Sequence, residues 1–117
     1  MGALVPASID IIRGTLDVLV LKALSWGPGH GYDVARWIQS ATNDVLEVGE
    51  GTLYPALHRL QARGWVKSSW GLSDTGRRAR YYELTTAGRA RLRVEKATWT
   101  RYAQAVFAAL EASAKPA

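Results

Sequence analysis

The chain has 117 residues, of which 48% are hydrophobic, so its length and composition suit one domain with one modest core. It contains no cysteine and only two histidines, which excludes disulfides and thiolate metal sites, and we expect no metal and no cofactor. The net charge of +5 lies entirely between Lys67 and Arg93, where seven basic residues accompany two acidic ones. Such a concentration of positive charge is typical of a nucleic-acid partner, although a solvated basic surface has the same composition.

Hydropathy and the first residues of the chain indicate no membrane partner. No apolar run approaches the ~18 residues that a membrane helix needs. The basic start, apolar run and cleavage site of a signal peptide are also missing. We therefore expect a soluble protein of the cytoplasm.

Two helices are expected in the first part of the chain. Residues 8–25 carry apolar side chains at positions 16, 19, 20, 23 and 24, which is helical spacing. Gly27 and Pro28 end this helix, since glycine accepts a left-handed turn and proline cannot continue a helix. Residues 31–41 form the second helix, and a short extended segment at 45–48 follows.

A third helix is expected at residues 52–63, with an inner face of Leu53, Ala56, Leu57 and Leu60. Its proline lies in the first turn, where amide hydrogens have no helical partner. The outer face carries Thr52, Tyr54, Pro55, His58, Arg59 and Ala62. Such a face fits the major groove of DNA, where base edges carry the sequence information, and an ordinary solvated helix surface is the alternative.

The second half of the chain predicts a β-hairpin and a long helix. Strands are expected at residues 65–70 and 80–84 around a turn at 71–76, with Tyr82 packed inward. A helix then runs from residue 85 or 86 to about 112, before a frayed tail at 113–117. Its apolar side is formed by residues 92, 99, 103, 106 and 110, and no other segment remains to cover it. A second copy of the chain would cover that side, most simply with two-fold symmetry.

This order of elements predicts a mainly α fold with a small β-hairpin (α+β). The specific expectation is a winged helix-turn-helix, followed by a long C-terminal dimerisation helix. We divide the chain into a DNA-binding domain at residues 1–85 and a dimerisation helix with its tail at residues 86–117.

Three motifs follow one another along the chain: GPGHGY at residues 27–32, EGTLYPALHRL at 50–60, and GRRARYY at 76–82 followed by LTTAG at 84–88. In this order they resemble the motifs of the PadR family of bacterial transcriptional regulators. The single C-terminal helix is similar to that of the small PadR subfamily. The residues alone predict a basic winged-helix protein that dimerises. The resemblance adds the role of a homodimeric repressor.

The hairpin and the second helix supply further candidate DNA contacts. Arg77 and Arg78 at the hairpin tip are expected to reach phosphates or the minor groove, with Lys67 and Arg80 beside them on the strands. A mobile charged loop is the alternative. Gly31 offers a free helix amide to a phosphate, and the resemblance implies a contact by Tyr32, for which core packing is almost equally supported.

The resemblance also implies a central cavity in the dimer that holds a planar apolar effector. The residues expected to border the cavity or the dimer interface are Ile11, Gly14, Asp17, Val18, Leu21, Lys96, Trp99, Ala103, Val106 and Leu110. For Trp99, plain dimer packing is the alternative. Lys96 departs from the apolar or aromatic residue more typical there, and an ion pair with Asp17 would partly close the cavity.

These observations predict a sequence-specific repressor that binds an inverted repeat in double-stranded DNA as a homodimer. Two alternatives are a winged helix that binds another protein and a sequence-neutral nucleic-acid-binding protein. An enzyme is not expected, since the sequence contains no phosphate loop, paired acid motif or metal-ligand spacing.

Overall fold

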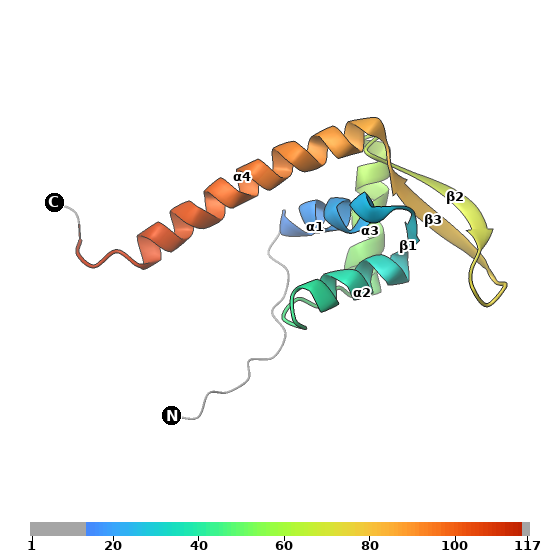
Figure 1. Ribbon diagram of the computed structural model, residues 1–117, viewed down its shortest axis with the longest axis horizontal. Helices are drawn as coiled ribbons and strands as arrows, with labels where there is room; N and C mark the ends of the chain where they lie inside the picture. Colours follow the sequence, from blue (N-terminus) through green and yellow to red (C-terminus); the bar gives the residue numbers. More distant parts are fainter. Residues whose placement is uncertain (1–13, 116–117) are drawn as a thin grey trace, which may run out of the picture.

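The computed structural model describes residues 14–115 and has the expected α+β winged-helix architecture (Figure 1). The elements in chain order are α1 (Thr15–Ala23), a 3-10 turn η1 (Leu24–Trp26), β1 (Gly29–His30), α2 (Gly31–Ala41), α3 (Glu50–Ala62), β2 (Val66–Leu72), β3 (Arg78–Leu84) and α4 (Thr86–Leu110). The first helix, predicted at 8–25, ends two residues early because the chain tightens into η1. Of the residues predicted before Thr15, Gly14 is not helical, and residues 8–13 fall outside the described residues.

The core lies where α1, α2 and α3 meet the base of the hairpin. The predicted inner face of α3 is buried in full, from Leu53 to Leu60. Val66, Tyr82 and Leu84 close the core from the sheet. The prediction that Tyr82 packs inward is therefore confirmed.

The sheet has three strands in the order β1-β3-β2, whereas the sequence predicted only the two-stranded hairpin. The additional strand β1 pairs Gly29 with Tyr82 and His30 with Tyr81. A strand of two residues has no alternation of apolar and polar side chains, so its sequence carries no strand pattern. Its pairing joins the turn before α2 to the middle of the hairpin.

The hairpin is two residues longer towards its tip than predicted, because β2 reaches Leu72 and β3 starts at Arg78. In this antiparallel register Val66 faces Leu84, Ser68 faces Tyr82, Trp70 faces Arg80 and Leu72 faces Arg78. Successive residues of a strand point to opposite faces, so all eight of these side chains belong to one face of the hairpin. That face is buried at its base and solvent-exposed at its tip.

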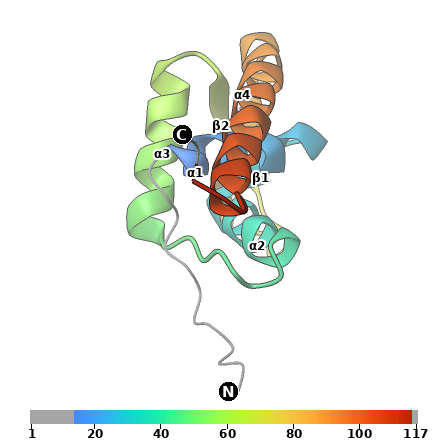
Figure 2. The same ribbon diagram turned by 90° about the vertical axis from the view of Figure 1, so that its left-hand side faces the viewer.

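Helix α4 starts at the base of the hairpin and runs over α1 (Figure 1). Its 25 residues correspond to about 37 Å at 1.5 Å per residue. The Thr85 hydroxyl caps the helix by accepting from the Gly88 amide at 3.0 Å, and it donates to the Gly64 carbonyl at 2.6 Å. Figure 2 shows α3 and α4 on either side of α1, and α1 contacts both of these helices.

Gly88 of α4 packs directly against the backbone of Trp65, the residue before β2. A Cβ atom at this position would lie 1.9 Å from the Trp65 carbonyl oxygen, which is a backbone atom that cannot move alone. We expect Gly88→Ala to lower the free energy of unfolding by about 3 kcal/mol, measured by denaturant unfolding. Gly51→Ala is the matched control, because a Cβ there meets no atom within 4 Å, and its effect should stay within about 1 kcal/mol. Equal stability of the two variants would contradict this close approach.

Candidate nucleic-acid interface

The outer face of α3 is solvent-exposed at every position predicted to contact DNA. Thr52, Tyr54, Pro55, His58 and Arg59 are all exposed, while the opposite side of the helix forms the core. Glycine at the N-cap and at the second helical position leaves the first turn of α3 open. The helix therefore presents one exposed face to solvent, and an α-helix is an element that a major groove admits.

Tyr54 is also the contact between α3 and α2. A Cβ at Gly31 would lie 2.7 Å from the Tyr54 hydroxyl oxygen, so only glycine allows this packing at the start of α2. Burial raises the pKa of the nearby Tyr82 hydroxyl, an effect that Arg80 opposes and Tyr54 reinforces. The Tyr82 hydroxyl is therefore protonated at neutral pH, and it remains a hydrogen-bond donor beside Arg80 and Tyr54.

The tip of the hairpin is held in one shape by its own hydrogen bonds. The Ser73 amide donates to the Arg77 carbonyl at 2.7 Å, and the Arg77 amide donates to the Ser73 hydroxyl at 3.2 Å. Gly76 adopts a φ of 77°, the left-handed region that favours glycine. Arg77 therefore extends from a turn that is closed by hydrogen bonds to Ser73.

A hollow of about 570 Å³ separates α3 from the hairpin. His58, Gln61 and Ala62 line it from α3, and Trp70, Arg80 and Tyr82 line it from the hairpin. We call this hollow the α3–hairpin trough. The structure thus brings together His58 and Arg80, which the sequence placed on separate surfaces.

Lys67 lies on the other face of the hairpin. It is opposite Glu83 in the register, and its ammonium group is 3.8 Å from the Glu83 carboxylate. Lys67 is therefore not gathered with Arg80 at the trough, although the sequence named both as flanking cations.

Tyr32 is exposed in the first turn of α2, so core packing, the alternative left open by the sequence, is wrong. Its ring stacks at 6.3 Å on His30, and the Arg36 guanidinium lies 5.6 Å from its centre. His30 caps α2, since its Nδ1 accepts from the Asp33 amide at 3.3 Å. Tyr32 is thus exposed next to a basic side chain, whereas Gly31, the other residue of this predicted site, is buried beside Tyr54.

Arg59 is not a free cation on the exposed face of α3. Its Nη2 atom donates to Asp17 Oδ1 of α1 at 2.9 Å. Within the described chain Asp17 thus pairs with Arg59, and the suggested ion pair between Asp17 and Lys96 is not formed there. Residues 42 positions apart gave no sequence signal for this contact.

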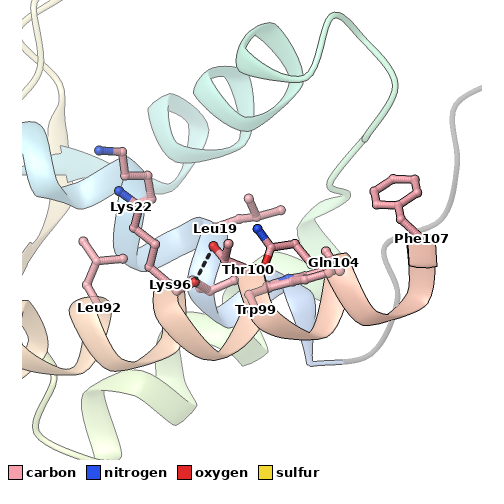
Figure 3. A pocket seen from close by; sticks show the side chains of 10 residues that line it. Leu19, Lys22, Leu92, Lys96, Trp99, Thr100, Gln104 and Phe107 are labelled. Atoms are coloured by element: carbon pink, nitrogen blue, oxygen red, sulfur yellow. Dashed lines mark hydrogen bonds between the residues drawn. The ribbon is translucent and has the colours of Figure 1, made fainter. Parts of the chain in front are cut away.

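The predicted cavity corresponds in part to an open groove of about 430 Å³ between α1 and α4 (Figure 3). Val18, Lys96, Trp99 and Ala103 line it as expected. Leu21 was expected there but is fully buried in the core. The residues next to Leu21 in α1 face α4 instead. The further lining residues, which the sequence did not assign to a cavity, are Leu19, Lys22, Leu92, Thr100, Gln104 and Phe107.

Three further residues of that prediction, Gly14, Val106 and Leu110, do not line the groove. Gly14 precedes α1 with a φ of 91°, and Val106 and Leu110 are exposed on the C-terminal part of α4. Ile11 lies outside the described residues. Trp99 packs edge-on against Tyr102 at 5.7 Å, so the groove has an aromatic wall, while Lys22 and Lys96 border its end near the start of α4 (Figure 3).

Residues 14–115 contain neither a candidate membrane span nor a candidate metal cluster. No helix in this range is long and apolar enough to cross a membrane. No group of three or more histidine or acidic side chains in the same range could hold a metal ion.

Comparisons with known sequences agree with these features. An uncharacterised protein of Lysinibacillus sphaericus is 36% identical over 84 residues, which cover 71% of this chain and 76% of that protein. A transcriptional regulator of Mycobacterium tuberculosis is 39% identical over 72 residues, which cover 61% of this chain and 66% of the regulator. A 37.1 kDa protein of a Streptomyces fradiae transposon is 40% identical over 78% of this chain, but the match spans only 25% of that longer protein.

Solved structures of transcriptional regulators have a similar fold. A transcriptional regulator of Clostridium thermocellum superposes with a TM-score of 0.73 at 30% identity, over 81% of this chain and 92% of the other. A PadR family regulator of Eggerthella lenta gives 0.70 at 32% identity, over 86% of each chain. The family model described as "Transcriptional regulator PadR-like family" matches residues 20–94, which include α2, α3, the hairpin and the start of α4. The chain therefore belongs to the PadR-like family of transcriptional regulators.

Proposed function

We propose that the chain is a homodimeric repressor that binds an inverted repeat in double-stranded DNA. The observation that carries this proposal is the α3–hairpin trough, which His58 of the exposed face of α3 and Arg80 of the hairpin line together. Helix α3 would enter the major groove, with Thr52, Tyr54, Pro55 and His58 at the base edges. The hairpin would follow the adjoining backbone through Arg77, Arg78 and Arg80.

Homodimer formation is supported by the apolar side of α4. Phe107 and Leu110 are 61% and 76% exposed, and Val106 lies on the same side one turn earlier. Within residues 14–115, α1 covers only the part of α4 nearer the hairpin, so the C-terminal part keeps a bare apolar stripe. A second copy would cover this stripe, and a two-fold axis would then set two α3 helices about one turn of DNA, or a small multiple, apart.

An effector, in this proposal, is a planar apolar molecule held in the α1–α4 groove. The groove wall of Trp99 and Phe107 supplies aromatic faces, and the α1 side belongs to the same helix that holds Arg59. A ligand that favours one spacing of α1 and α4 would change the separation of the two recognition helices. Repression would be relieved in the state whose separation does not match the operator.

The first test concerns the dimer. Phe107→Glu combined with Leu110→Glu places charges on the apolar stripe, so we expect a monomer in sedimentation at concentrations where the wild type is a dimer. Arg101→Glu is the control, because it changes charge on the opposite side of α4. Sedimentation of the double variant as a dimer would refute the assigned interface.

The second test separates the roles of helix and hairpin. Arg77→Ala should weaken binding to every duplex and reduce the salt slope by about one, since it removes one phosphate contact. His58→Ala should cost more on an operator selected from a random pool than on unselected DNA, by about tenfold. Titrations of both duplexes at several salt concentrations give these values. A wild type with no preferred sequence would favour a sequence-neutral binding protein, and proportional losses in both variants would refute the division of roles.

The third test concerns the groove. A neutral or anionic planar dye should bind with about micromolar affinity and quench tryptophan fluorescence, because aromatic stacking adds to apolar burial. Cationic dyes should bind more weakly, because Lys22 and Lys96 border the groove, and Lys96→Leu should reduce that difference. If Trp99→Ala binds the dye with unchanged affinity and quenching, Trp99 does not line an effector site and only packs in the dimer interface.

A further inference from the structure

Trp70 is a large apolar side chain in an unusual place, at the exposed part of the hairpin. It is 56% exposed and contributes nothing to the core, so hydrophobic burial does not account for it. Two guanidinium groups gather at its ring instead. Arg78 lies 4.6 Å and Arg80 lies 5.5 Å from the ring centre.

The strand register explains why these three side chains meet. Trp70 is directly opposite Arg80 and diagonal to Arg78, on the hairpin face that continues from Tyr82. Because Trp70, Arg80 and Tyr82 also line the α3–hairpin trough, the cations are held on the side of the hairpin that faces α3.

Arg80 has a second restraint. Its Nε atom donates to the Ser68 hydroxyl at 3.0 Å, which leaves the two terminal amino groups available. A ring contact together with a hydrogen bond at Nε limits both the position and the tilt of the guanidinium plane.

The cluster carries uncompensated positive charge. Among residues 14–115, neither Arg78 nor Arg80 is part of a salt bridge, although Arg59, Lys67 and Arg91 are. Two cations held at one neutral ring without a carboxylate repel each other, and an anion placed between them removes that repulsion. Guanidinium groups with free amino ends match the oxygen atoms of a phosphate.

We infer that Trp70 and Ser68 are positioning residues that hold Arg78 and Arg80 as a preformed clamp for one phosphodiester group of the DNA backbone. This inference rests on the proposed function and deepens it, because it assigns the cause of tight backbone binding to two residues that carry no charge. The clamp lowers the loss of side-chain freedom when DNA binds, since both arginines already occupy the bound arrangement.

The clamp is tested with a labelled DNA duplex of arbitrary sequence, since phosphate contacts do not depend on the operator. Trp70→Leu keeps an apolar side chain but removes the aromatic ring, so binding measured by fluorescence anisotropy should weaken about three- to tenfold. Trp70→Phe keeps a ring and should retain most of the affinity. Ser68→Ala should cause a smaller loss than Trp70→Leu.

Trp26→Leu is the matched control. Trp26 is 69% exposed and also carries a cation, with Lys22 at 4.5 Å from its ring, but it lies outside the trough. Its replacement should leave DNA affinity unchanged. Thermal unfolding of all variants should match the wild type, because both tryptophans are exposed.

A double-mutant cycle separates positioning from direct contact. In the Arg78→Gln, Arg80→Gln background, Trp70→Leu should have no further effect, since the side chains that it positions are gone. An unchanged loss in that background would overturn the inference and make Trp70 a DNA contact in its own right. Equal affinity of the wild type and Trp70→Leu would also overturn it.

The same experiment distinguishes this inference from the proposed function. If the wild type fails to bind any duplex, the proposed function fails and the clamp fails with it. If the wild type binds and Arg78→Gln, Arg80→Gln weakens binding while Trp70→Leu does not, only the clamp is refuted.

Discussion

The pairing of β2 with β3 decides which hairpin side chains meet the helices and which do not. With Val66 opposite Leu84, every second residue on each strand belongs to the inner face, and the same alternation continues outward to Trp70, Arg80 and Arg78. A slip of one residue would turn Lys67 and Glu83 inward and turn the trough-facing residues away. The pairing of β1 with Tyr81 and Tyr82 joins a third strand to this register. Core packing and the placement of the cations are thus two results of one alternation.

Much of this arrangement could be predicted from sequence because the patterns are local. Helical spacing identified the inner face of α3, and the turn chemistry after Trp70 identified the hairpin. The same reasoning fails where local pattern is ambiguous. Helix α1 is apolar over a broad arc, so the sequence could not tell that Leu19 rather than Leu21 faces α4. Rotation of a helix about its axis is decided by its neighbours and not by its own spacing.

Contacts between residues that are far apart in the chain could not be predicted from the sequence either. The Arg59–Asp17 ion pair joins two helices whose relative placement no spacing reveals. Trp70 was assigned to a strand but not to the candidate site, because its role follows from the residue opposite it. A register shift of the predicted hairpin would have given it a different partner. The charge count located the basic segment correctly, but only the pairing shows that Lys67 and Arg80 lie on opposite faces.

The exposed apolar stripe of α4 has a consequence for the amount of working regulator in a cell. If a second copy covers Phe107 and Leu110, as proposed, the stability of each protomer rises with the concentration of the protein. Newly made chains at low abundance would then present a hydrophobic surface that proteases and chaperones recognise, whereas assembled pairs would persist. The level of active protein would consequently rise more steeply than its rate of synthesis, which gives a threshold to any gene that it controls.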